Sequence, residues 1–314
     1  MSGENSKKSG EIGEKLASSL LNIIGWKNNI HNISIDCNRS THLNSKGGKR
    51  QTHGEDHIFL FDTPFHDDRT DIIHISDKNI NKKYPISDNT LKTKFKEHVK
   101  ELSETINCSR SSPKLYDIIS TVKTKKQIFH YGLLIWLQND LDGIEKDIKP
   151  IIATSAKMEI DCESPIFIID NARASFLVKV VKDLKTRSLS EDYEFYYPRI
   201  GTVISQDAMR TGKVLPLELI VSDIIPAVIE IAQGKAFVLY ANESFDKDCY
   251  KKLIEYALKF ADSLITTIYI GMPDYNAAQN KQDAEIVRAA FKDRKEEIIP
   301  FGLNFSPLSL LEGN

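Results

Sequence analysis

Two neighbouring segments each contain a short apolar run bounded by polar residues, and this pattern predicts β-strands. The segments are His53–Asp62 and Thr70–Lys78, and a short polar connection that contains Pro64 joins them. An acid, Asp56, lies near the start of the first strand, and Lys78 closes the second. Two adjacent strands of this kind bring a carboxylate and an ammonium group to one point of a sheet.

Apolar residues spaced three or four positions apart predict helices on either side of these strands. One helix is expected over Glu11–Trp26 and ends near Gly25, and a second is expected over Leu91–Ile106 with Thr90 as its N-cap. The very apolar segment Gln127–Gln138 indicates a buried strand. Further predictions in this half are a strand at Asn32–Cys37 and a short helix at Leu115–Val122.

A polar, charged stretch at Asp140–Pro150 indicates a domain boundary. We predict a disordered tail at residues 1–10, a first domain at 11–145 and an accessory or partner-binding domain at 146–314. Strands and helices alternate in the second half, which predicts an α/β region. The expected strands there are Ile166–Asp170, Glu194–Val203, Ala236–Ala241 and Thr266–Met272, the expected helices are Arg173–Leu184, Asp246–Ser263 and Asp283–Glu297, and Leu215–Ile231 is unassigned.

Composition and charge indicate a soluble globular protein. The chain has 314 residues and a formal net charge of −2, so its overall charge does not by itself indicate a nucleic-acid partner. Apolar runs such as Leu264–Met272 are too short to span a bilayer, and Met1–Lys15 is too polar for a secretory signal. The sequence therefore predicts a cytoplasmic location without a membrane partner.

The cysteines and histidines show none of the short spacings of common metal motifs. The cysteines stand singly, which fits a reducing compartment and argues against a zinc ribbon or a redox motif. Several histidines lie around the two strands without HxH or HExxH spacing, so a zinc enzyme is not expected. The cysteines are Cys37, Cys108, Cys162 and Cys249, and the histidines near the strands are His53, His57, His66 and His74.

Motifs of other α/β enzymes are absent: the sequence has no P-loop, no G-x-G-x-x-G and no G-x-S-x-G. The two strands instead carry the groups that phosphodiester hydrolysis requires. A divalent cation polarises the phosphate and activates water, hard cations prefer carboxylate oxygens, and a lysine stabilises negative charge. Residues i and i+2 of a strand share a face, so Ser76 and Lys78 point the same way and Asp77 points the other way.

On these residues the chain resembles the PD-(D/E)XK, or restriction-endonuclease-like, nuclease superfamily. The matching segments are Gly54-x-Asp56, Ile73 to Lys78, and Gly13-Glu14-Lys15 on the preceding helix. The resemblance implies an α/β fold with an α-β-β-β-α-β core. It also implies a Mg²⁺ (or Mn²⁺) ion held by Asp56 and Glu14, with Lys78 beside the attacking water.

Ser76 departs from the superfamily pattern because it occupies the position of the second acid. Its hydroxyl is a weaker metal ligand than a carboxylate. The catalytic set implied by the resemblance is thus Asp56, Ser76, Lys78 and Glu14. Either Glu97 or Glu101 of the following helix supplies the second carboxylate, or the site is degenerate and binds without cutting.

Basic residues lie on both sides of the predicted strands in sequence. Lys49 and Arg50 belong to a glycine-containing loop, and Lys92 and Lys96 lie on the helix after the strands. We name these four as candidates for binding nucleic-acid phosphates. An ordinary solvated helix face explains the helix lysines equally well.

A closer resemblance covers residues 13–113, especially His53–Phe59 and Leu91–His98. These segments are similar to the nuclease-type subunit of two-gene bacterial anti-phage defence systems, which implies a partner protein from an adjacent gene, a homo-oligomer, or both. The leading hypothesis is a metal-dependent DNA nuclease. The rivals are a catalytically degenerate nuclease-fold scaffold that binds DNA or a partner, and an α/β interaction protein without a nucleic-acid role.

Overall fold

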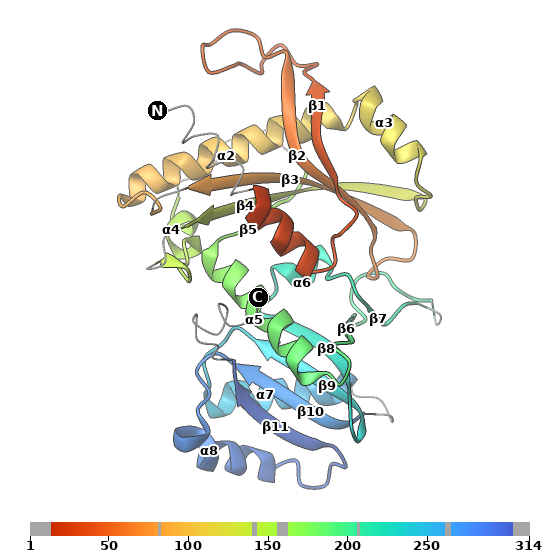
Figure 1. The fold of residues 1–314 in the computed structure, drawn as a ribbon, viewed down its shortest axis with the longest axis vertical. Coiled ribbons are helices and arrows are strands. Elements are labelled where there is room, and N and C mark those ends of the chain that lie inside the picture. Colours follow the sequence, from red (N-terminus) through yellow and green to blue (C-terminus); the bar gives the residue numbers. More distant parts are fainter. Residues whose placement is uncertain are drawn as a thin grey trace. The chain divides into compact units, whose positions relative to one another are not determined.

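The computed structural model describes residues 14–80, 83–139, 143–155, 163–205, 208–260 and 265–303. The chain forms two compact units, 1–175 and 176–314, and each contains one sheet (Figure 1). This division lies beyond the boundary predicted at residues 145 and 146, because strand β5 (Ile166–Ile169) pairs with the first sheet. The predicted disordered tail, residues 1–10, lies outside the described residues.

The first unit contains a five-stranded mixed sheet in the order β1-β2-β3-β4-β5. The pairs β1–β2 and β2–β3 are antiparallel, whereas β3–β4 and β4–β5 are parallel. The strands predicted around the polar turn are therefore confirmed as neighbours. The bounds of the first four strands are β1 (Ile30–Asp36), β2 (Thr52–Asp62), β3 (Arg69–Ile80) and β4 (Gln127–Gln138).

The helices of the first unit complete the predicted α-β-β-β-α-β order. A helix over residues 14–23 precedes β1 and ends before Gly25, whose φ of 91° is a left-handed conformation without steric penalty for glycine. The helix α2 follows β3, and its N-cap position is Ser87, so the predicted cap Thr90 lies inside the helix and that prediction is wrong. The remaining bounds are α2 (Asp88–Ser109), α3 (Pro113–Ser120), α4 (Lys149–Ala153) and α5 (Asn171–Arg187).

Both faces of the first sheet are covered by apolar side chains. Trp26, which follows the first helix, stacks on Phe59 of β2 with ring centroids 4.5 Å apart. The preceding residue of the strand, Ile58, points to the opposite face and packs with Leu115 of α3. On that face the apolar side of α2 covers β4, where Trp136 is fully buried. This packing fixes α2 against β3 and β4, and so positions its polar residues at the ends of these strands.

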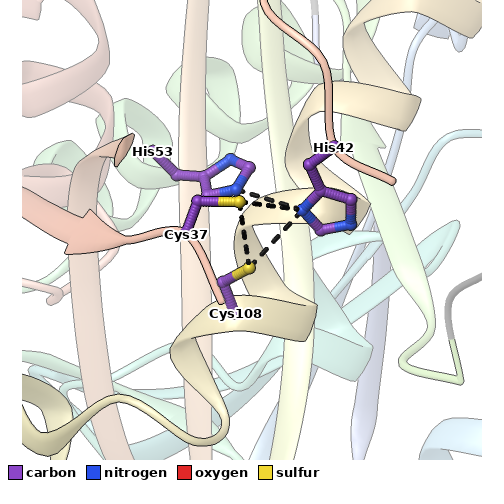
Figure 2. A group of neighbouring side chains, drawn as sticks. All are labelled: Cys37, His42, His53 and Cys108. Atoms are coloured by element: carbon purple, nitrogen blue, oxygen red, sulfur yellow. Dashed lines mark hydrogen bonds between the residues drawn. The ribbon is translucent and has the colours of Figure 1, made fainter. Parts of the chain in front are cut away.

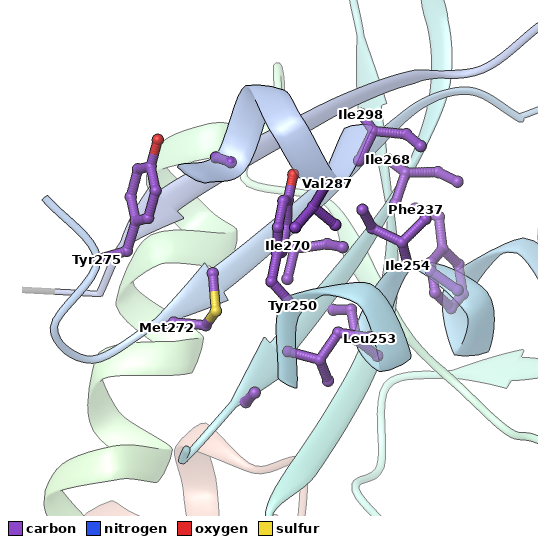
Figure 3. Close-up of a cluster of buried hydrophobic side chains, with 14 of the residues drawn as sticks. Phe237, Tyr250, Leu253, Ile254, Ile268, Ile270, Met272, Tyr275, Val287 and Ile298 are labelled. Atoms are coloured by element: carbon purple, nitrogen blue, oxygen red, sulfur yellow. The ribbon is translucent and has the colours of Figure 1, made fainter. Parts of the chain in front are cut away.

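The second unit contains a six-stranded sheet in the order β11-β10-β9-β8-β6-β7. The strands β9, β10 and β11 are parallel, and α7 and α8 form the connections between them, which confirms the predicted α/β character. Its core packs α7 and α8 on these strands (Figure 3). The bounds are β6 (Tyr193–Tyr196), β7 (Thr211–Gly212), α6 (Leu217–Ile220), β8 (Ile224–Ile231), β9 (Gly234–Ala241), α7 (Lys247–Phe260), β10 (Ile265–Met272), α8 (Ala277–Ala289) and β11 (Glu297–Gly302).

Two predictions in this unit differ from the structure. The helix expected over Asp283–Glu297 begins earlier, because the side chain of Asn276 caps it by accepting a hydrogen bond from the backbone N–H of Ala278, 2.9 Å away. The end of that predicted helix is the first residue of β11, an edge strand beside β10. The strand expected over Glu194–Val203 stops at Tyr196.

Candidate active site

Asp56 lies where β2 leaves its regular pairing with β3. That pairing ends at His57 opposite Ile75, and the residues of β2 before His57 have no partner in β3 among the described residues. The pairing of β2 with β1 is also distorted here, since Asn32 has a φ of 52°. The strands therefore open at Asp56.

The carboxylate of Asp56 reaches across this opening to the end of β3. Its Oδ2 accepts a hydrogen bond from the backbone N–H of Asp77 at 2.8 Å, and the hydroxyl of Ser76 lies 3.4 Å away. Ser76, at the position of the missing acid, thus contacts the first acid directly. The structure brings Asp56 and Ser76 together.

Asp77 points to the other face of β3 and joins a second acidic group. Its Oδ2 lies 2.7 Å from Nε2 of His57, and both side chains are buried. Its Oδ1 is buried without a hydrogen-bond partner among the described residues. Burial raises the pKa of Asp77, the contact with His57 opposes this, and the negative charges of Asp56 and Glu14 raise the pKa further.

Asp77 of β3 is therefore within electrostatic reach of two further carboxylates, Asp56 from β2 and Glu14 from the first helix. Glu14 is exposed, and its charge also acts on His31. Like charges gathered at a partly buried site repel one another unless a cation neutralises them. Carboxylate oxygens are the ligands that a hard divalent cation prefers.

Lys78 lies on the α2 side of β3, where its Nζ is 2.9 Å from Oε2 of Glu101. Arg50 approaches the other oxygen of Glu101 at 3.3 Å. Partial burial raises the pKa of Glu101, but the positive charges of Lys78 and Arg50 outweigh it, so that the pKa lies below its usual value. Of the two glutamates expected from this helix, the structure brings Glu101 to Lys78, whereas Glu97 pairs with Lys94 at 2.6 Å.

The four predicted phosphate-binding residues have different surroundings. Lys49 is exposed in the β1–β2 loop. Arg50 is a quarter exposed, and its charge is shared with Glu101 and Glu104 of α2. Lys92 and Lys96 are half-buried on α2, one turn apart, and within the described part of the chain neither forms an ion pair. Arg50 therefore links the loop to α2, while the three lysines remain available to an anion.

Two buried clusters of polar side chains were not predicted from the sequence. In one, His74 of β3 bonds to Glu55 and to His130, with 2.9 Å between the two ring nitrogens. In the other, the cysteines and histidines come from distant segments, so no short spacing could reveal them (Figure 2). The members of this second group, the Cys2His2 cluster, are Cys37, His42, His53 and Cys108.

Comparison with known families bears on the whole first unit. A family model for the PD-(D/E)XK nuclease domain of the GAPS4 protein matches residues 1–173. The chain belongs to this family. The match confirms the resemblance to the PD-(D/E)XK superfamily and to a nuclease subunit of an anti-phage defence system, and it ends close to the first unit's own end at Ser175.

Other comparisons give no match, either among curated proteins or among solved structures. Among the described residues, none of the helices has the length and apolar character needed to cross a membrane.

Proposed function

We propose that this protein hydrolyses DNA phosphodiester bonds with Mg²⁺ (or Mn²⁺), in anti-phage defence together with a partner protein, as a homo-oligomer, or both. The observation that carries the proposal is the contact between Asp56 and Asp77 at the diverging ends of β2 and β3, with Glu14 near enough to raise the pKa of Asp77. Membership in a nuclease family supports it. A cytoplasmic location is part of the proposal, because phage DNA is met there.

Asp56 and Glu14 would hold the metal, and Asp77 would supply the second carboxylate in place of Ser76. Asp77 has a buried oxygen without a partner among the described residues, whereas the charge of Glu101 is already matched by two basic side chains. A bound divalent metal ion would polarise the phosphate and lower the pKa of the attacking water. Ser76 would orient Asp56 through its hydroxyl.

Lys78 would stabilise the negative charge that develops on the phosphate. Its ion pair with Glu101 is only partly buried, so a phosphate oxygen can replace the carboxylate at modest cost, about 1 kcal/mol. Lys49, Lys92 and Lys96 would contact neighbouring phosphates, with Arg50 holding the loop in place. Binding would then weaken steeply with salt.

The test is cleavage of plasmid and linear DNA by the full chain, alone and co-expressed with the product of the adjacent gene. Asp56→Ala, Lys78→Ala and Asp77→Asn are expected to abolish cutting without unfolding the chain. Glu101→Gln, a matched removal of one carboxylate charge, is expected to retain cutting. If Asp56→Ala and Lys78→Ala cut as well as the parent chain, the proposal is wrong. If Glu101→Gln is inactive and Asp77→Asn is active, Glu101 is the second acid.

A catalytically degenerate scaffold is the second candidate. Two observations favour it: a serine occupies the second-acid position, and Lys78 is bonded to Glu101. Calorimetric titration with Mn²⁺ separates the two candidates, because a nuclease has a site that Asp56→Ala removes and a scaffold has none.

A further inference from the structure

Two cysteines and two histidines converge beside the C-terminal end of α2 (Figure 2). Cys37 directly follows β1, His42 lies in the β1–β2 loop, His53 is in β2, and Cys108 is near the end of α2. Their four ligand atoms lie within 4.8 Å of one another, and three of the four residues are buried. Segments 71 residues apart in sequence thus meet in one cluster.

Hydrogen bonding accounts for this arrangement only in part: Sγ of Cys37 lies 3.5 Å from the carbonyl oxygen of Arg39 and Sγ of Cys108 lies 3.3 Å from Oδ1 of Asn38, but neither contact explains the crowding at His42. Three atoms approach Nδ1 of His42: Nε2 of His53 at 3.2 Å, Sγ of Cys108 at 3.4 Å and Sγ of Cys37 at 3.6 Å. An imidazole nitrogen carries either one proton or one lone pair, so it forms one such bond. The remaining approaches to Nδ1 of His42 have no hydrogen bond of their own, and a common partner between the four atoms would account for them.

Four of the six distances between the ligand atoms agree with the edges of a tetrahedron around a zinc ion, and the other two, from His53 to the sulfur atoms, are no longer than 4.8 Å. Zn–S bonds of about 2.3 Å and Zn–N bonds of about 2.05 Å require ligand atoms separated by about 3.8 Å for two sulfurs, about 3.5 Å for sulfur and nitrogen, and about 3.3 Å for two nitrogens. The two sulfur atoms are 4.0 Å apart, and the other separations around His42 are 3.2 to 3.6 Å. The S···S distance is also far too long for a disulfide, which requires about 2.05 Å.

We propose that Cys37, His42, His53 and Cys108 bind a structural Zn²⁺ ion. Each thiol releases its proton to solvent as the metal–sulfur bond forms, and each histidine coordinates as a neutral imidazole, so the Cys2His2 cluster and the ion are neutral together. Four protein ligands fill the tetrahedron and leave no position for a substrate. The site is therefore structural and separate from the carboxylates at Asp56.

The zinc site would fasten the β1–β2 loop to α2. Beyond His42 the loop continues to Arg50, whose backbone N–H donates to the carbonyl of His42 at 2.9 Å. Arg50 in turn contacts Glu101, the partner of Lys78. The loop is otherwise polar and contains few apolar side chains that could anchor it. A metal cross-link thus supplies the order that the loop needs to keep Lys49 and Arg50 at a fixed place beside α2.

Zinc content of the full chain, purified without added metal or chelator, tests the inference. We expect one zinc ion per chain by elemental analysis. Cys108→Ser and His42→Ala should lose it, whereas Cys249→Ser, a cysteine of the second unit, should keep it. Asp56→Ala should also keep it, which separates this site from the proposed catalytic metal. Because a ligand variant can fail to fold, cobalt exchange into the unaltered chain provides a second measurement.

Tetrahedral Co²⁺ bound to thiolates gives intense visible bands and a thiolate-to-metal charge-transfer band in the near ultraviolet. Their appearance in the unaltered chain and in Cys249→Ser supports the inference. It is overturned if the chain contains no zinc and takes up no cobalt with these bands, or if mass spectrometry of the freshly isolated chain shows a Cys37–Cys108 disulfide. It is also overturned if Asp56→Ala, and not Cys108→Ser, removes the zinc. Each result stands whether or not the protein cuts DNA.

Discussion

Replacing His74 with alanine is expected to destabilise the first unit strongly. The side chains of His74 and Glu55 are 0% and 1% exposed, and Nδ1 of His74 bonds directly to Oε1 of Glu55. That oxygen also accepts a hydrogen bond from the hydroxyl of Ser109 at 3.1 Å, and Nε2 of His74 lies 2.9 Å from His130. These contacts join β2, β3, β4 and α2 in one buried polar group.

The expected cost for His74→Ala is about 3–5 kcal/mol, because the substitution leaves a buried carboxylate without its main partner. Glu55→Gln retains an oxygen acceptor and removes the charge, so its cost is expected to be smaller, about 1–2 kcal/mol. In the double variant the loss of His74 costs less, because the uncharged amide at position 55 requires less stabilisation than the buried carboxylate of Glu55. The two costs should therefore fall short of additivity by about 1 kcal/mol or more.

Urea unfolding followed by tryptophan fluorescence provides the assay. Both tryptophans of the chain, Trp26 and Trp136, are fully buried in the first unit, so their fluorescence reports on that unit alone. Lys94→Ala removes an exposed ion pair and serves as the control, with an expected change below about 0.5 kcal/mol. The reasoning is refuted if His74→Ala costs less than about 1 kcal/mol, or no more than Glu55→Gln.

Three further predictions concern packing, acid stability and the second unit. Gly132→Ala should destabilise the first unit by about 1–3 kcal/mol in the same fluorescence assay, because a Cβ would lie 2.8 Å from Ile166 and 3.0 Å from Ile106; no change would show that α2 moves freely on β4. Burial, aided by Lys78 for His98 and by His74 for His130, lowers the pKa of His98 to about 4 and that of His130 to about 3. These two histidines therefore bind more protons in the unfolded chain below pH 6.5, and the free energy of unfolding should fall by about 2–3 kcal/mol from pH 6.5 to 5; urea midpoints that stay constant or rise over this range contradict it. Asp183→Ala should lower the free energy of unfolding of the second unit by about 3 kcal/mol, because Arg187 and Tyr240 both bond to that carboxylate and would lose their acceptor. Amide hydrogen exchange in the second unit that is as slow as in the parent chain would disprove this.

Sequence periodicity was sufficient for most of the first unit. The predicted strand Gln127–Gln138 agrees with β4 at both ends, and the two apolar segments around Pro64 pair as expected. Such patterns succeed because each strand has to bury one or both faces, and the required spacing of apolar residues is local. Boundaries set by capping were less well predicted, as at Thr90 and Asn276, because several polar residues near a helix start can each serve as the cap.

The candidate site was only partly visible in the sequence. Asp56, Ser76 and Lys78 could be found because they lie on two adjacent strands. The sequence left Glu97 and Glu101 as alternatives, and packing of α2 on β4 decided that Glu101 meets Lys78. The acidic surroundings of Asp77 depend on where the first helix places Glu14, which no strand pattern contains.

The sequence by itself determined most of the α/β elements and their order, because these follow from local spacing, and it marked Asp56 and Lys78 on neighbouring strands as candidates. Only the tertiary structure decided which distant side chains meet. The Cys2His2 cluster shows this most clearly: its ligands come from the end of β1, the following loop, β2 and α2. Their convergence depends on the position at which α2 crosses the sheet, and that position is set by the apolar core between α2 and β4 rather than by any spacing along the chain.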